Sequence, residues 1–231
     1  MNVVVYHGNE YADAVAGHLI DAVQSNPAAR IVLPTGRTPE PVYRSFADRG
    51  GSLADATIML LDEFGLPPRS HARCDNMLQR DLLDRLEKPP ARLLTWNTAA
   101  EDLDAMCADM DVEAQRGIDL VILGIGGNGH LGINEPGTPS DAPSRVVELH
   151  AETAAATSRY GAETAPTWGV TLGLGPILGA SAVWLLATGA HKAAIVRSAL
   201  EGPIGSEVPA SFVRRHENAI VFLDEAAASD L

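Results

Sequence analysis

A glycine-rich loop carries the histidine and the carboxylate best suited to acid–base chemistry. The loop follows an apolar run at residues 118–123 and places His130 among glycines, with Glu135 further on. Histidine titrates near neutral pH and can both donate and accept a proton. A carboxylate within reach would fix its tautomer and stabilise its charged form. The alternative is an ordinary structural hydrogen bond, which the flanking glycines disfavour because they offer few packing neighbours.

The same loop contains the spacing G-x-G-x-x-G from Gly124 to Gly129, which is also a fingerprint of dinucleotide-binding proteins. That fingerprint requires a helix directly after the glycines, because the helix N-terminus receives the pyrophosphate. Here a proline and further glycines follow, and no helical pattern begins before about Ala151. The sequence therefore disfavours nicotinamide binding.

Two adjacent acids, Asp62 and Glu63, follow a second apolar run. Adjacent side chains on an extended chain point in opposite directions, so we expect at most one of them to face a pocket. A carboxylate in that position could abstract a proton from carbon. The alternative is a solvated pair of loop acids, since acidic side chains are usually exposed.

The segment Thr35-Gly36-Arg37-Thr38 follows another apolar run and precedes a helical pattern. Thr38 is predicted to cap that helix, and Pro39 suits its first turn. Free N–H groups at a helix N-terminus, together with the threonine and arginine side chains, could hold a phosphate. The alternative is an ordinary capped turn between a strand and a helix.

A second cationic segment contains Lys192, in the run LLATGAHKA. A lysine in the first turn of a helix opposes the helix dipole, which makes the position unfavourable unless an anion is bound. Lys192 is therefore a candidate phosphate ligand. The alternative is a lysine that faces solvent.

Short β-rich runs alternate with helical patterns along the whole chain. Several runs are almost continuously apolar, which is typical of parallel strands covered on both faces. The expected strands are residues 2–6, 30–33, 57–61, 92–96, 118–123, 145–149, 168–172, 182–187 and 219–223.

The helical patterns show apolar side chains at the spacing that faces a core. The stripes are Ala12, Val15, Leu19 and Val23; Leu78, Leu82, Leu83 and Leu86; and Leu103, Met106, Cys107 and Met110. The alternation predicts βαβ units with right-handed crossovers. We predict one α/β domain over residues 1–231, with an open, mostly parallel, modified Rossmann-like sheet and helices on both faces. Ligands of such sheets bind beyond the carboxyl ends of the strands, so the segments above should meet there.

The composition excludes several classes of partner. The formal net charge is −13 and the sequence pI is about 4.8, so the chain repels nucleic acid and anionic membranes. The two cysteines form no metal-type spacing and suggest no disulfide framework. No run reaches the roughly 18 apolar residues of a membrane span, and the N-terminus does not resemble a secretory signal. We expect a cytoplasmic protein.

A set of segments, in order, resembles the superfamily of glucosamine-6-phosphate deaminases and 6-phosphogluconolactonases. The segments are LPTGRTPEPVY, LLDEFGLP, GIDLVILGIGGNGHLGINEPG, TSRY and LLATGAHKA, which span residues 33–193. The pairing of LDEF with NGHLGINEPG favours the deaminase branch. The lactonase branch typically has an arginine soon after the acid pair and a Thr-Ala-Ser-Leu-Phe-Pro-like run after the Gly-His, and neither is present here.

The resemblance implies a role for each matched residue. Asp62 would move a proton between C2 and C1 of an open-chain amino sugar. His130 would open the pyranose ring, and Glu135 would support that histidine. Asn128 would belong to the same catalytic set. The implied phosphate-binding set is Thr35, Gly36, Arg37, Thr38, Arg159 and Lys192, with no metal and no organic cofactor.

The sequence departs from the family pattern in two places. Asn128 stands where the family often has aspartate, and a neutral amide would stabilise a protonated His130 less than a carboxylate would. The segment from Arg73 to Leu78 replaces a usual Ser-Tyr and Phe-Met pair, which bears on sugar specificity.

The resulting hypothesis is conversion of D-glucosamine 6-phosphate and water to D-fructose 6-phosphate and ammonia. The alternatives are hydrolysis of 6-phosphogluconolactone, isomerisation of galactosamine 6-phosphate, and a sugar-phosphate binding protein with little turnover. The sequence predicts no oligomeric state and no effector.

Overall fold

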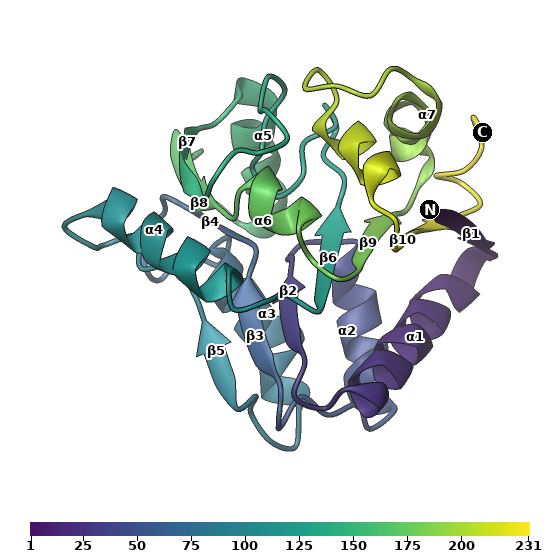
Figure 1. Cartoon of the computed structure of the whole chain (residues 1–231), viewed down its shortest axis with the longest axis horizontal. Helices are drawn as coiled ribbons and strands as arrows, with labels where there is room; N and C mark the ends of the chain where they lie inside the picture. Colours follow the sequence, from purple (N-terminus) through teal and green to yellow (C-terminus); the bar gives the residue numbers. More distant parts are fainter.

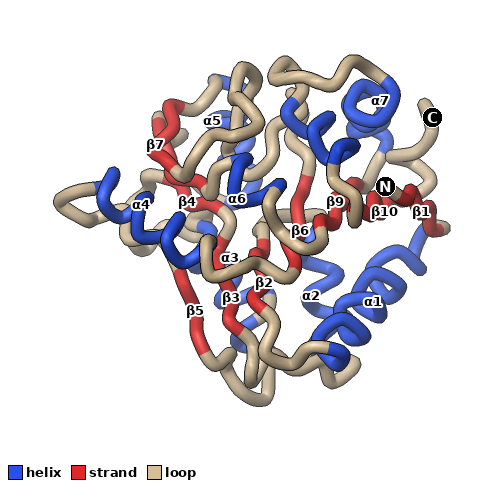
Figure 2. The backbone as a smooth tube through the Cα atoms, viewed as in Figure 1, coloured by secondary structure: helices blue, strands red, loops and turns tan.

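Seven parallel strands form the main sheet of the computed structural model, which describes residues 1–231. The apolar runs 30–33, 57–60 and 120–124 lie inside this sheet, as their composition predicts. Figures 1 and 2 show the arrangement. The order across the sheet is β1 (Asn2–Tyr6), β10 (Ala219–Asp224), β9 (Val183–Ala187), β6 (Leu120–Gly124), β2 (Arg30–Leu33), β3 (Thr57–Leu60) and β5 (Arg92–Leu94).

Helices cover the sheet, with α2 and α3 behind it and α4 and α6 in front in the view of Figure 1. The α-helices are α1 (Tyr11–Ser25), α2 (Pro39–Asp48), α3 (Cys74–Asp81), α4 (Leu103–Ala114), α5 (Ala151–Ala156), α6 (Leu174–Leu178) and α7 (Ala193–Glu201). Short 3₁₀ helices are η1 (Gly8–Glu10), η2 (Leu83–Arg85), η3 (Thr157–Tyr160), η4 (Ala190–Lys192) and η5 (Pro209–Arg215). The predicted α/β class is confirmed.

The apolar stripes of the sequence become one continuous core. In α1, Val15, Leu19 and Val23 are buried against the sheet. Burial of each such side chain contributes about 1.5–3 kcal/mol relative to leaving it in water. The stripe that ends at Leu86 is not one helix, because α3 stops at Asp81 and a 3₁₀ turn continues it.

Two expected strands belong to a second sheet, which corrects the prediction of a single one. Strands β4 (Asp62–Phe64), β8 (Trp168–Thr171) and β7 (Arg145–Glu148) form an antiparallel sheet in the order β4, β8, β7. The acid pair therefore lies on a strand and not in a loop. Leu61 joins the two sheets, because its N–H donates to Leu33 of β2 and its carbonyl accepts from Leu172, just after β8.

The strand order reverses between β2 and β6. From β2 the chain continues outward to β3 and β5, and it then returns to β6 on the other side of β2. The carboxyl ends of two such strands leave a crevice between them, which is the usual ligand site of open α/β sheets. No helix in the structure combines the length and the apolar content that crossing a bilayer requires.

Candidate active site

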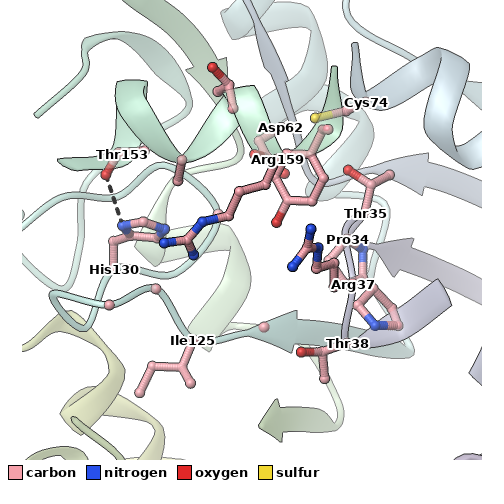
Figure 3. A pocket seen from close by; sticks show the side chains of 18 of the residues that line it. Pro34, Thr35, Arg37, Thr38, Asp62, Cys74, Ile125, His130, Thr153 and Arg159 are labelled. Carbon is pink, nitrogen blue, oxygen red and sulfur yellow. Dashed lines mark hydrogen bonds between the residues drawn. The ribbon is translucent and has the colours of Figure 1, made fainter. Parts of the chain in front are cut away.

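A cavity of about 470 Å³ opens where β2 and β6 end. Small-molecule sites usually enclose about 300–1,000 Å³, so the space suits a compact ligand. Most of the residues singled out in the sequence reach it, and Figure 3 shows Arg37, Asp62, His130 and Arg159 around the same space. The predicted residues that line it are Thr35, Arg37, Thr38, Asp62, Asn128, His130, Arg159 and Lys192.

Asp62 presents a nearly buried carboxylate to this cavity. Its side chain lies at the wall, the residue is 8% exposed, and no hydrogen bond from the protein reaches its oxygens. Burial raises the pKa of Asp62 to about 7, because the charged form loses its hydration. A carboxylate in this state can act as a base at neutral pH while keeping affinity for the proton that it accepts.

Its neighbour Glu63 points the other way, as expected of adjacent residues on a strand. Glu63 is fully buried and does not line the cavity. Its carboxylate accepts the N–H groups of Phe64 at 2.8 Å and Cys74 at 2.9 Å. Burial raises the pKa of Glu63, and the N–H group of Asp75 and the Arg73 guanidinium act against that rise.

His130 and Glu135 form the pair that the loop spacing predicts, with Glu135 behind the cavity wall. His130 Nδ1 lies 3.5 Å from Glu135 Oε2 and 3.3 Å from Thr153 Oγ1. The other ring nitrogen, Nε2, therefore remains free for a ligand. Burial disfavours the charge on Glu135, but hydrogen bonds from His130, Thr153 and Asn128 outweigh burial and lower its pKa to about 2.

Asn128 contacts this pair through both ends of its amide. Its Oδ1 accepts the backbone N–H of His130 at 3.2 Å, and its Nδ2 donates to Glu135 Oε2 at 2.8 Å. An aspartate at this position would lack the donor and would place a second carboxylate against Glu135. Asn128 thus shapes the loop and orients Glu135, and no direct bond to the imidazole ring is present among its contacts.

Gly126 allows the imidazole to lie where it does. A Cβ atom built on Gly126 would lie 2.3 Å from both Cε1 and Nε2 of His130, which is far inside van der Waals contact. We expect Gly126→Ala to displace the ring and lower kcat by about 10- to 100-fold, since small misplacements of catalytic groups reduce rates to this extent. Steady-state kinetics measure the effect.

Gly205→Ala is the matched control for that variant. A Cβ atom on Gly205 would meet nothing within 4 Å, and its φ lies outside the left-handed region. Its activity should equal that of the unmodified protein. Equal activities of the two alanine variants would show that the position of the imidazole does not matter.

Cationic and hydroxyl groups line the same cavity. Lys192, Arg37 and Arg159 reach it from three different segments, and Thr38 Oγ1 lies 3.3 Å from Thr188 Oγ1. Thr38 holds the predicted N-cap position of α2, with Pro39 in the first turn, but its side chain makes no capping bond and Thr38 lines the cavity. Gly36 lies in the turn itself, at φ +114°, against the Tyr160 ring.

The Lys192 side chain is held against the glycine-rich loop. Its Nζ donates to the carbonyl of Ile125 at 2.7 Å, at the start of the loop that carries His130. Burial lowers the pKa of Lys192, and the charge of Arg159 lowers it further. A bound anion would raise the pKa of Lys192 again, because a nearby negative charge favours the charged ammonium.

The sequence did not single out several other lining residues. Thr188 directly follows β9, so the same rule about strand ends would have found it. The part of the wall formed by α5 and η3 does not follow a strand of the main sheet, so the strand-end rule does not identify its residues. The residues missed include Cys74, Met77, Glu152, Thr153, Tyr160, Thr188 and His191.

The fold and the cavity define an α/β protein with one crevice that is lined by acidic, imidazole and cationic side chains. A family described as glucosamine-6-phosphate isomerases/6-phosphogluconolactonase matches this chain over residues 7–222. The chain belongs to this family.

Several relatives match over the whole chain. A protein of Pseudarthrobacter chlorophenolicus named glucosamine-6-phosphate deaminase is 37% identical over 100% of this chain and 93% of its own length. A protein of the same name from Enterococcus faecalis is 35% identical over 100% of both chains. The solved structure of a monomeric glucosamine-6-phosphate deaminase has a TM-score of 0.93 at 32% identity, over 100% of both chains. A 6-phosphogluconolactonase of Thermotoga maritima has a TM-score of 0.78 over 96% of this chain and 99% of its own, but is 21% identical and shares the fold alone.

Proposed function

We propose that this chain is an isomerising deaminase that converts D-glucosamine 6-phosphate and water to D-fructose 6-phosphate and ammonia. The observation that carries the proposal is one cavity in which an unpartnered Asp62 and the free nitrogen of His130 face the space next to a cluster of cations. Full-length relatives with this name support the same substrate.

The phosphate anchors the substrate in this scheme. Arg37, Arg159 and Lys192 neutralise its charge, and the Thr38 hydroxyl donates a hydrogen bond to it. The sugar ring then lies toward His130 and Asp62. Fixing one end of a flexible sugar in this way places its reactive carbons within reach of the two catalytic groups.

His130 opens the pyranose ring by moving a proton between the anomeric hydroxyl and the ring oxygen. Glu135 fixes the tautomer by accepting the hydrogen bond of Nδ1, so Nε2 handles the proton. Asp62 next accepts the proton from C2, which is acidic because it lies beside the C1 aldehyde. Return of that proton to C1 gives a C2 imine, and water hydrolyses the imine to the ketone and ammonia.

Ammonia release from a panel of phosphorylated sugars tests the proposal. Glucosamine 6-phosphate should release ammonia and form fructose 6-phosphate, and galactosamine 6-phosphate should react more slowly. Preferred turnover of galactosamine 6-phosphate would reassign the substrate. Hydrolysis of 6-phosphogluconolactone without deamination would reassign the reaction, and tight binding without any product would leave a sugar-phosphate binding protein.

The activity should depend on pH through Asp62. Asp62 must be ionised to accept the C2 proton, and burial raises its pKa to about 7. We therefore expect kcat/KM to be lost as the pH falls through 7, approaching about one log unit per pH unit at lower pH.

The ionisation of the substrate phosphate needs a separate control, because a phosphomonoester has a pKa of about 6. The inhibition constant of inorganic phosphate over the same pH range supplies it. A value of kcat/KM that stays constant from pH 8 to pH 5.5 after this correction would show that Asp62 is not the base.

A further inference from the structure

A buried cluster of charged side chains lies behind Asp62, on the side of β4 that faces away from the cavity. Glu63 is fully buried and Arg73 is 5% exposed. Arg73 Nη2 lies 3.3 Å from Glu63 Oε2 and 2.7 Å from Asp75 Oδ2. Charged groups lose hydration on burial and remain there only when they are paired and hydrogen-bonded. The proposed reaction uses none of these three residues directly.

Glu63 connects the strand that carries Asp62 to the helix that follows. Its Oε1 accepts the N–H of Phe64 within β4 and the N–H of Cys74 at the start of α3. Its Oε2 accepts the N–H of Asp75 at 2.9 Å. Those two helical N–H groups have no partner inside α3, so Glu63 supplies the bonds that the helix itself cannot. One carboxylate thus joins β4 to the first turn of α3.

That connection matters because α3 forms part of the cavity wall. Cys74 and Met77 line the cavity beside Asp62, and both belong to α3. The bonds of Glu63 therefore set the position of this wall relative to the proposed base.

Arg73 holds the same carboxylate in place from behind. It donates to the carbonyl of Leu66 at 3.1 Å and to Thr98 Oγ1 at 2.8 Å, in addition to its bonds with Asp75. The chain between β4 and α3 is thereby fixed to the turn after β5. The segment from Arg73 onward, which departs from the family pattern in sequence, thus builds this cluster and contributes mainly Cys74 and Met77 to the cavity.

The Asp62 carboxylate has no donor of its own from the protein, so its direction depends on the backbone of β4. We propose that Glu63, held by Arg73, is a positioning residue that aims Asp62 at the reacting carbon through the bonds joining β4 to α3. This inference rests on the proposed deaminase function. Glu63 itself touches neither the substrate nor the reacting atoms.

Glu63→Gln tests this role. The amide group of glutamine would turn a donor toward at least one backbone N–H that now has an acceptor. We expect kcat to fall by about 10- to 100-fold, the range that misplacement of a catalytic group produces. KM should stay near the unmodified value, because the cations that bind the phosphate lie on other segments.

A substrate with deuterium at C2 gives a second readout that a loss of stability would not change. A well-aimed Asp62 returns part of the deuterium to C1, whereas a misdirected carboxylate exchanges more of it with solvent. The fraction of deuterium at C1 of the product should therefore be lower in Glu63→Gln. Mass spectrometry of fructose 6-phosphate measures it, at a temperature where circular dichroism shows the variant folded.

Phe222→Leu is the control for stability. Phe222 is fully buried in β10, where its ring packs on Tyr6 and Trp184 and makes no contact with β4. This variant should lose stability and keep both kcat and the deuterium fraction. Arg73→Lys serves as the second test if Glu63→Gln does not fold, because lysine keeps the charge but loses the fork that reaches Leu66 and Asp75.

The outcomes separate the two claims. Wild-type kcat and deuterium transfer in the folded test variant would overturn the positioning role and leave the deaminase intact. No ammonia release by the unmodified protein would reject the proposed function itself, whatever the variants do. A loss of kcat and of deuterium transfer together, with KM preserved, supports the inference.

Discussion

Asp62→Asn is expected to lower kcat for ammonia release by about 100- to 10,000-fold, the range that general acid–base catalysis contributes. Asparagine has nearly the shape of aspartate but cannot accept the C2 proton. Since Asp62 receives no hydrogen bond from the protein, the substitution breaks no contact, and KM should change little. Stopped assays of ammonia and fructose 6-phosphate measure the loss.

The same variant should be more stable than the unmodified protein at pH 8. The pKa of Asp62 is about 7 when folded against a reference value of 3.8, so the folded state binds the proton more tightly. Stability from this group is present at low pH and is lost as the pH rises from about 4 through 7. The neutral amide removes that loss, so the gain in Tm should be large at pH 8 and should shrink toward pH 5.

Asp21→Asn, at an exposed position of α1, is the control for both measurements. It should change neither kcat nor the dependence of Tm on pH. Full activity of Asp62→Asn would reject the proposed base. An unchanged Tm at pH 8 would show that burial of the charged Asp62 carboxylate does not destabilise the folded state.

Lys192→Met is expected to raise KM by about 10- to 100-fold, because a hydrogen bond between charged groups contributes about 1.5–3 kcal/mol. Lys192 lines the cavity, and methionine fills a similar volume without the charge. Lys192 bonds to the Ile125 carbonyl and makes no hydrogen bond with Asp62 or His130, so kcat should fall much less than kcat/KM does. Initial rates over a wide range of substrate concentrations separate the two effects.

Lys88→Met is the matched control, since Lys88 is the other lysine of the chain and is exposed outside this cavity. It loses the same charge from a strongly acidic protein, so a general electrostatic effect on an anionic substrate would appear in both variants. Equal increases of KM would therefore mean that the overall field binds the substrate, and that Lys192 has no local role.

Strand ends were the most informative feature of the sequence. Thr35, Asp62, His130 and Lys192 each follow an apolar run closely, and the structure brings all four to one cavity. This part was predictable because parallel strands end at the same edge of a sheet. Arg159 is different, since it lies on η3 beyond the second sheet and only the resemblance to a family singled it out.

The second sheet could not be predicted from local pattern. Residues 145–148 and 168–171 are extended, as expected, but pairing partners are chosen by contacts between distant segments. At Leu61 the chain leaves the main sheet, because its N–H and its carbonyl bond to different sheets. The acid pair therefore lies on β4, where adjacent side chains point in opposite directions.

By itself, the sequence determined the α/β class, the main parallel strands and the residue types at their carboxyl ends. The periodicity of apolar side chains is a local property, so it can be read directly from the order of the residues. The tertiary structure alone decided that Asp62 has no donor, that Thr153 and Asn128 contact the His130–Glu135 pair, and that Arg73 and Glu63 form a cluster behind Asp62. These properties depend on which distant groups surround an atom, because desolvation and hydrogen bonding act through space and not along the chain.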